Sequence, residues 1–161
     1  MQTGTKPLLF VDIDGVLSLF GFAPDAVPEH GRWLQVDGIL HFLSEDAAGH
    51  LHDLADLYDH VWCSGWKDRA NDHLPHLLGL GPYPYLDFGA GPGHWKLAAV
   101  RAYARDRLCA WIDDDVNDAV RDWARGRSQP TLVVETRPAT GLTAELAARL
   151  RAWGEGVAAR P

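Results

Sequence analysis

The chain is poor in cysteine and methionine and has no long apolar run. It holds two cysteines and one methionine in 161 residues, and no stretch approaches the roughly 18 apolar residues of a membrane span. The first residues, MQTGTKPLLFVDID, carry one lysine and no extended apolar segment, so we expect neither a signal peptide nor a membrane anchor. We therefore predict a cytoplasmic protein with no membrane partner.

The two cysteines lie in apolar, strand-like runs, which indicates buried thiols in a reducing compartment. In the fold class argued below, the first strand should lie between the strands that carry Cys63 and Cys109. Two strand spacings amount to roughly 9.5 Å, beyond the ~7 Å Cα limit for a disulfide. We expect both thiols to be free.

Positive charge is also in deficit. Fifteen Lys and Arg residues face 22 Asp and Glu residues, which gives a net charge of −7. The chain thus lacks the broad basic surface of non-specific nucleic-acid binding, and nucleic acid enters only as a substrate. Sixteen glycines and ten prolines are too few for a low-complexity chain. We expect one globular domain over residues 1–161.

Short apolar runs alternate with helical patterns along the chain, which is typical of a parallel α/β sheet. This pattern predicts a three-layer, doubly wound, mostly parallel five-stranded sheet with no large cap, in which sites form beyond the carboxyl ends of the strands. The expected strands are 8–13, 61–64, 85–88, 109–113 and 131–135. The expected helices are 45–58, 69–79, one through Leu97 and Tyr103, 116–125, and one that begins near Thr143.

The segment between Ser18 and Leu43 departs from this alternation. It contains WLQV-DG-ILHF, and an Asp-Gly pair between β-prone residues is a strong hairpin signal. We expect a hairpin over 32–43, either as an edge ribbon or as a flap over the site. In a flap, Arg32 would meet a phosphate and Trp33 would offer an aromatic face to a base or sugar.

Acidic residues gather where two of the predicted strands end. Asp12 and Asp14 close the first strand, and the run Asp113–Asp115 closes the fourth, followed by Asp118. Clustered carboxylates repel one another unless a cation or a proton compensates them. Oxygen-rich sites of this kind suit Mg²⁺, which binds carboxylates together with phosphate and water oxygens.

Motifs in the same order resemble those of the haloacid dehalogenase superfamily of phosphotransferases. The run DIDGVL (12–17) is similar to its first motif, Ser64 to the Ser/Thr of the second, and Lys96 to the Lys of the third. The run WIDDDVND (111–118) resembles the fourth motif. There, either Asp114 with Asp118 or Asp113 with Asp114 fills the acidic positions.

The resemblance implies a Mg²⁺-dependent phosphomonoester hydrolase that works through an aspartyl-phosphate. Asp12 would be the nucleophile and Asp14 the general acid and base. Ser64 and Lys96 would hold the phosphate oxygens. Mg²⁺ would be held by Asp12, by the main-chain carbonyl of Asp14, and by Asp114 with Asp113 or Asp118.

A finer resemblance links the chain to compact, capless members of that superfamily, namely domains attached to RNA-repair proteins. It rests on WCSGWKDRAN (62–71), HWKL (94–97), WIDDD (111–115) and the GLT before the last helix. It implies a nucleotide or nucleic-acid-end phosphate as substrate. Trp66 and Trp95 fall near the predicted site loops, where they would either stack on a base or pack the core.

Other interpretations are weaker. A receiver-like or non-catalytic module that binds phosphate and metal is the main alternative, although receivers carry their acceptor aspartate in mid-chain. GAGPGH (89–94) is not a dinucleotide motif, since His94 stands where GxGxxG needs glycine. The histidine pairs 50/52 and 73/76 have no accompanying CxxC, which argues against zinc.

Overall fold

A four-stranded parallel sheet forms the centre of the protein. In the computed structural model, which describes residues 4–89 and 95–160, its strands lie in the order β5-β1-β6-β7. They span Leu8–Val11 (β1), Asp59–Trp62 (β5), Cys109–Asp113 (β6) and Thr131–Glu135 (β7). All four residues of β1 are apolar and buried. Such a strand requires cover on both faces of the sheet.

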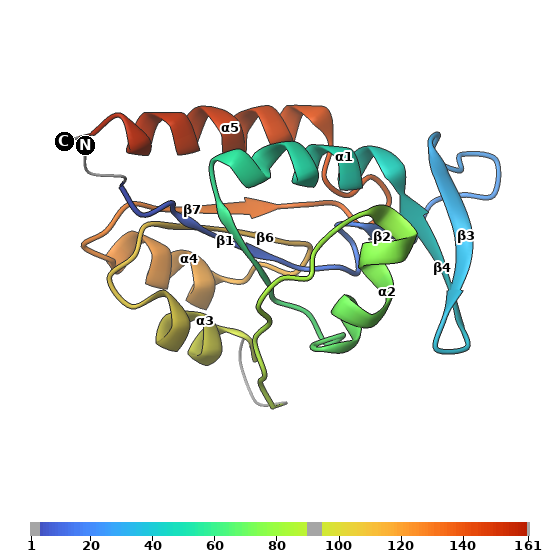
Figure 1. Cartoon of the computed structure of the whole chain (residues 1–161), viewed down its shortest axis with the longest axis horizontal. Helices are drawn as coiled ribbons and strands as arrows, with labels where there is room; N and C mark the ends of the chain where they lie inside the picture. The colour runs from blue at the N-terminus through green and yellow to red at the C-terminus, as the bar shows by residue number, and fades with distance from the viewer. Residues whose placement is uncertain (1–3, 90–94, 161) are drawn as a thin grey trace.

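Helices provide that cover in two layers (Figure 1). The helices α1 (Glu45–Asp53) and α5 (Ala144–Ala158) lie over one face, and α3 (Leu97–Ala104) and α4 (Asp118–Gly126) lie over the other. Successive side chains of a strand point to opposite faces, and β1 feeds both cores. Leu9 and Val11 join the first core, while Leu8 and Phe10 join the second. The predicted α/β layering is confirmed.

Side-chain caps fix where the helices start. Ser44 accepts a hydrogen bond from Ala47 N at the start of α1, and Thr143 accepts one from Leu146 N at the start of α5, as expected of N-cap residues. The helix predicted over 45–58 is shorter than expected. It ends at Asp53 and continues as a 3₁₀ turn, η1 (Leu54–Asp56).

The prediction of a fifth strand over 85–88 was wrong. Tyr85 forms only an isolated bridge with Trp62, through hydrogen bonds from Trp62 N to Pro84 O and from Leu86 N to Trp62 O. Pro84 has no N–H to donate, so pairing cannot begin earlier. β5 ends at Trp62, and so the bridge does not extend into a ladder.

The predicted hairpin is present, as part of a second, antiparallel sheet with the order β2-β4-β3. Its strands are β2 (Ser18–Leu19), β3 (Gly31–Val36) and β4 (Ile39–Ser44). Asp37 and Gly38 form the turn with φ values of 51° and 80°, the positive values that a two-residue hairpin turn favours. This sheet stands at one end of the parallel sheet, close to α2 (Arg69–Leu78) (Figure 1).

Both cysteines are free and buried, as predicted. β1 lies between β5 and β6, so the strand order on which that prediction rested is also confirmed. Among the helices of the described residues, none has the length and apolar character needed to cross a membrane.

The loop from β7 to α5 packs tightly against the loop that follows β1. Leu142 N donates to Val16 O over 3.1 Å. Gly141 has φ +62°, and a Cβ at this position would lie 2.3 Å from Val16 O. Gly79 at the end of α2 has a similar φ of +68° but nothing within 4 Å of such a Cβ.

We therefore expect Gly141→Ala to destabilise the protein more than Gly79→Ala. Both variants force alanine into the left-handed region, but only the first also drives a methyl group into backbone. The additional loss should be about 1–3 kcal/mol, measured by urea denaturation of both variants. Equal losses would mean that the loop moves aside without cost.

Candidate functional site

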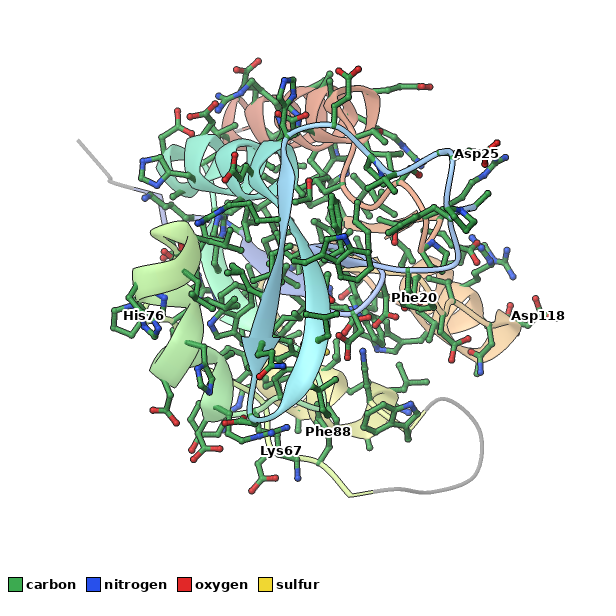
Figure 2. All side chains as sticks on the ribbon, turned by 90° about the vertical axis from the view of Figure 1, so that its right-hand side faces the viewer. Phe20, Asp25, Lys67, His76, Phe88 and Asp118 are labelled. Atoms are coloured by element: carbon green, nitrogen blue, oxygen red, sulfur yellow. The ribbon has the colours of Figure 1, made fainter. Side chains whose placement is uncertain are left out.

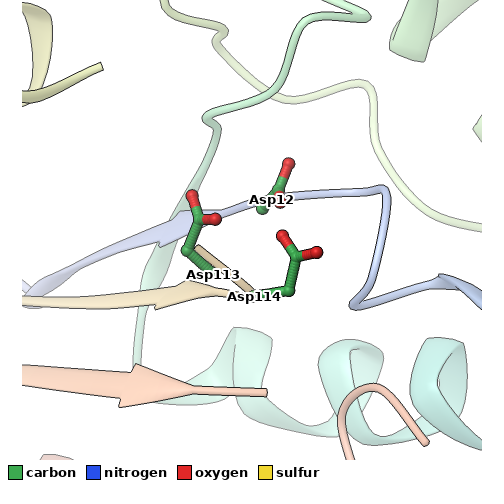
Figure 3. Close-up of side chains that lie close together, drawn as sticks. All are labelled: Asp12, Asp113 and Asp114. Atoms are coloured by element: carbon green, nitrogen blue, oxygen red, sulfur yellow. The ribbon is translucent and has the colours of Figure 1, made fainter. Parts of the chain in front are cut away.

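Three carboxylates converge at the carboxyl edge of the parallel sheet (Figure 3). Asp12 follows β1 directly, Asp113 is the last residue of β6, and Asp114 comes next. The two strands are neighbours and pair Val11 with Ile112, which places Asp12 beside Asp113. One oxygen from each of the three side chains lies within 4.8 Å of the others. Asp12 and Asp113 are buried, and Asp114 is half-buried.

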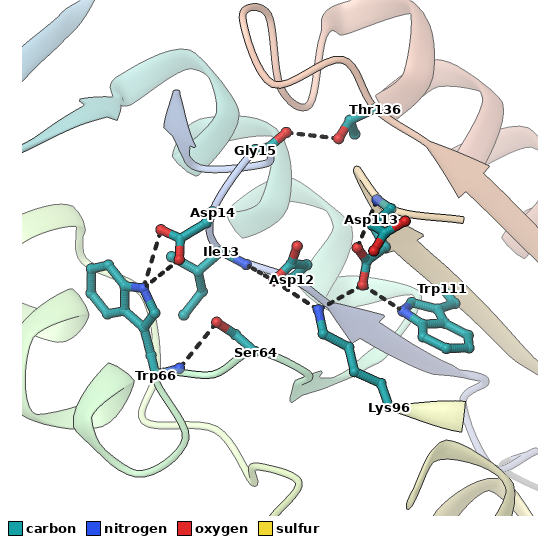
Figure 4. A network of polar contacts seen from close by, with 11 residues as sticks. Asp12, Ile13, Asp14, Gly15, Ser64, Trp66, Lys96, Trp111, Asp113 and Thr136 are labelled. Atoms are coloured by element: carbon teal, nitrogen blue, oxygen red, sulfur yellow. Dashed lines mark hydrogen bonds and ion pairs between the residues drawn. The ribbon is translucent and has the colours of Figure 1, made fainter. Parts of the chain in front are cut away.

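Lys96 supplies a cation to this cluster. It immediately precedes α3 and is 4% exposed. Its Nζ lies 3.1 Å from Asp12 Oδ1 and donates to Asp113 Oδ2 over 2.7 Å (Figure 4). Burial alone would lower the pKa of Lys96, but the charges of Asp12 and Asp113 outweigh it and raise that pKa above its usual value. Lys96 is therefore charged at neutral pH.

One ammonium group does not balance three carboxylates. Burial and the nearby charge of Asp113 raise the pKa of Asp12 well above its usual value, although Lys96 works in the opposite direction. Burial is also the main cause that raises the pKa of Asp114. With all three carboxylates ionised, the cluster has an excess of negative charge over the one ammonium group, which a divalent cation would compensate.

Backbone and indole N–H groups orient the two buried carboxylates (Figure 4). Ile13 N donates to Asp12 Oδ1 over 2.8 Å. Asp113 accepts from Asp115 N over 3.0 Å and from the indole nitrogen of Trp111 over 3.3 Å. Both side chains are therefore held in position before any ligand arrives.

Gly15 allows the loop after β1 to lie against the cluster. A Cβ at this position would lie 2.4 Å from the carboxylate of Asp114, and φ is +83°. Thr136, which follows β7, donates its hydroxyl hydrogen to Gly15 O over 2.7 Å and so holds the loop from the other side. The glycine of DIDG is thus required by the proximity of Asp114.

Asp14 is more exposed than the three clustered carboxylates, at 51% of its side chain. The indole N–H of Trp66 lies 3.2 Å from each of its two carboxylate oxygens (Figure 4). His41 of β4 approaches within 3.7 Å of Asp14 Oδ1, and its Nδ1 lies 2.7 Å from Ser18 Oγ. The hairpin therefore reaches the site through His41.

Ser64 completes the predicted set. It follows β5, is 1% exposed, and accepts a hydrogen bond from Trp66 N over 3.2 Å. It lines a cavity of about 290 Å³ together with Asp12, Asp14 and Lys96. The structure therefore brings all four predicted catalytic residues together, with Asp113 and Asp114 in the same wall.

The remaining predicted residues lie elsewhere or act differently. Asp118 is exposed as the first residue of α4 and is not part of the carboxylate cluster. Arg32 pairs with Glu45 over 2.8 Å and donates to Leu77 O, so its guanidinium is directed to α1 and α2. Trp66 is only 5% exposed and offers no open ring face to a base.

Two other tryptophans do face open space. Trp33 is 52% exposed, and Trp95 is 37% exposed. Trp95 lines the cavity of Asp12, whereas Trp33 lines an adjoining groove that also contains Asp14.

Most of GAGPGH lies outside the described residues. The group of described residues that could hold a metal ion, Asp12, Asp113 and Asp114, contains no histidine.

Sequence reasoning did not assign roles to Trp111, Thr136 and His41. Trp111 lies two residues before Asp113 on the same strand, so strand periodicity places it on the same face. No sequence pattern marks Thr136 or His41, because their contacts with Gly15 and Asp14 join segments that are distant in the chain.

No protein-family model matches the chain, and no curated protein sequence matches it. The interpretation of the site therefore depends on its geometry. That geometry combines an all-oxygen donor set for a hard cation, a fixed ammonium group, and a buried hydroxyl in one cavity.

We expect Lys96→Met to destabilise the protein strongly in metal-free buffer. The substitution leaves Asp12 and Asp113 buried without their cation, which typically costs about 3–5 kcal/mol. Lys67→Met is the control, because Lys67 pairs with Asp87 at the surface, where side-chain exposures are 37% and 76%. Exposed pairs contribute about 0–1 kcal/mol.

The pH dependence of that loss is a second readout. Lys96 lowers the pKa of Asp12, so the folded Lys96→Met variant holds the Asp12 proton to higher pH than the wild type. Protonation of Asp12 then relieves part of the deficit, and the difference in unfolding free energy should narrow as the pH falls. A difference that is constant between neutral and acidic pH would contradict this electrostatic account.

Proposed function

We propose that this protein is a Mg²⁺-dependent phosphomonoester hydrolase of the haloacid dehalogenase type, acting through an aspartyl-phosphate. The observation that carries the proposal is the position of Lys96. Its ammonium lies against both Asp12 and Asp113, in the cavity that Asp14 and Ser64 also line. A nucleophile, an acid–base group and two phosphate-binding groups are thus available around one position.

The residues present fit a magnesium ion. Oxygens of Asp12, Asp113 and Asp114 lie within 4.8 Å of one another, and carboxylate oxygens are suitable ligands for Mg²⁺. These three side chains, with the main-chain carbonyl of Asp14, would hold it. When bound, the ion would neutralise charge on the nucleophile and on the phosphoryl group. Asp118, exposed on α4, is not in this proposed ligand set.

The first step is attack by Asp12 on phosphorus. Its carboxylate is held through Oδ1 by Ile13 N and Lys96, so we assign the attack to Oδ2. The new bond joins this oxygen to phosphorus, and the bond from phosphorus to the alcohol oxygen breaks. Ser64 and Lys96 would hold the non-bridging oxygens while negative charge is redistributed.

Asp14 moves the protons. As a carboxylic acid it protonates the departing alcohol oxygen, and as a carboxylate it then takes a proton from the water that hydrolyses the aspartyl-phosphate. The Trp66 indole, 3.2 Å from both oxygens, fixes the plane of the carboxyl group. Asp14 is partly exposed and outside the metal-binding cluster, so it can exchange protons with water.

Asp12→Asn should abolish turnover while the fold persists, because the amide has nearly the same shape but no nucleophilic oxygen charge. Loss of a covalent nucleophile costs several orders of magnitude in rate. Asp118→Asn is the matched control and should retain activity, since Asp118 is exposed outside the cluster. Phosphate release with Mg²⁺ measures both. Near-normal activity of Asp12→Asn would contradict its assignment as nucleophile, whereas a wild type that releases no phosphate would favour a receiver-like or non-catalytic module.

Mg²⁺ should raise the melting temperature, because it binds the folded carboxylate cluster and not the unfolded chain. At a concentration 100 times the Kd, the stabilisation is about 2.7 kcal/mol. Asp114→Ala should abolish this shift, whereas Asp118→Ala should preserve it. Thermal unfolding with and without Mg²⁺ tests the assignment. A shift that survives Asp114→Ala but disappears in Asp118→Ala would reverse the choice between the two residues.

A further inference from the structure

An apolar groove adjoins the cavity of Asp12. It has a volume of about 580 Å³ and lies between the chain that follows β2 and the β3–β4 hairpin. Phe20, Trp33 and Leu40 line it and are 49%, 52% and 57% exposed. Figure 2 views the molecule from the side of the hairpin and shows Phe20 next to the hairpin. Large apolar side chains grouped in this way on a surface commonly mark a binding site.

The aromatic wall of this groove is held in position. The ring of Trp33 lies 5.3 Å from that of Phe42 and 5.9 Å from that of Phe22. Phe42 is buried and pairs with Trp33 across the hairpin. Trp33 therefore presents a supported surface, and little conformational entropy is lost when a flat ring packs against it.

Asp14 connects the groove to the cavity of Asp12, because it lines both. In phosphoryl transfer, the attacking and leaving oxygens lie roughly in line on opposite sides of phosphorus. A phosphoryl group attacked by Asp12 therefore directs its alcohol part away from Asp12. If Asp14 protonates the departing oxygen, that alcohol part lies beside Asp14, at the mouth of the groove.

The charge of the groove limits what the alcohol part can be. Among the described residues, its lining contains no lysine or arginine, and its one histidine, His41, is directed to Asp14 and Ser18. Arg32, next to Trp33, is engaged by Glu45 over 2.8 Å. The groove thus offers no lysine or arginine to a second phosphate, while its aromatic and aliphatic side chains suit an uncharged flat ring.

We propose that this groove binds the leaving alcohol, and that the substrate is a small phosphomonoester whose alcohol part carries an uncharged aromatic ring. This inference rests on the proposed function, since it uses Asp12 and Asp14 as nucleophile and acid. A volume of about 580 Å³ is within the range of small-molecule sites. The ring comes from a nucleoside or from an aryl-substituted alcohol, and the test separates these sources.

Matched substrate pairs isolate the ring from the reactivity of the ester. One pair is adenosine 5′-phosphate and ribose 5-phosphate, and the other is 2-phenylethyl phosphate and ethyl phosphate. Within each pair both leaving groups are primary alkoxides, so a difference in kcat/KM reports chiefly on binding of the ring. We expect the ring-bearing member of at least one pair to be preferred, and the preferred pair identifies the source of the ring.

Trp33→Ala should reduce that preference by roughly 5- to 150-fold, the range of one ring stack, with little change for the ring-free member. Tyr85→Ala is the control, because Tyr85 is an aromatic residue of similar exposure, 43%, outside the groove. Phe20→Ala is a second groove variant, in case Trp33→Ala fails to fold. Equal rates within both pairs, or equal losses for both members, would overturn the proposal. So would a preference for a 3′-phosphorylated oligonucleotide over all four esters.

Binding to Asp12→Asn separates this proposal from the proposed function. Calorimetry with the two members of each pair, in Mg²⁺, measures the preference for the ring without turnover. Tighter binding of a ring-bearing ester that disappears in Asp12→Asn/Trp33→Ala supports the groove even if the wild type hydrolyses nothing, in which case the proposed function alone fails. Equal binding of both members overturns the groove even if every ester is hydrolysed.

Discussion

The contact of Lys96 with Asp12 and Asp113 is the interaction on which the site depends. β1 and β6 are adjacent, Asp12 follows β1 directly and Asp113 ends β6, so the sheet register itself brings two buried carboxylates together. Such an arrangement is costly without a buried cation. The ammonium that compensates it comes from the start of α3. One salt-bridged centre therefore links the ends of β1 and β6 to the start of α3, with the third carboxylate, Asp114, beside it.

The loops at this edge hold one another in position. Thr136 donates its N–H to Asp113 O and its hydroxyl hydrogen to Gly15 O, which ties the end of β7 to both acidic segments. Gly15 gives Asp114 the space it needs, and Gly141 brings the chain after β7 against Val16. Precise positions of catalytic groups require this kind of support from the surrounding residues, and here it comes from backbone contacts of small residues.

The hairpin is fixed at both of its ends. At its turn, Asp37 accepts a hydrogen bond from Arg69 over 2.8 Å and lies 3.1 Å from His73 Nε2, which joins it to α2. At the other end, Phe42 and Leu43 of β4 are buried. His41, also in β4, lies against Asp14 and Ser18 and so joins the hairpin to the site. The hairpin is therefore a supported wall beside Asp14. Its open side chains, Trp33 and Leu40 among them, form the groove that the substrate proposal uses.

The sequence by itself determined the α/β alternation, the hairpin turn at Asp37-Gly38, and the set of acidic, hydroxyl and lysine residues at the strand ends. These signals are local: apolar periodicity, a turn that needs positive φ, and polar residues where buried strands stop.

Only the tertiary structure decided which residues share the site. It grouped Asp113 and Asp114 with Asp12 and left Asp118 exposed. It also turned Arg32 towards Glu45 and placed the Trp66 indole on Asp14. It reduced residues 85–88 to one bridge between Tyr85 and Trp62, the residue at which β5 ends. Each of these outcomes depends on contacts between residues far apart in the chain, and local periodicity carries no information about such contacts.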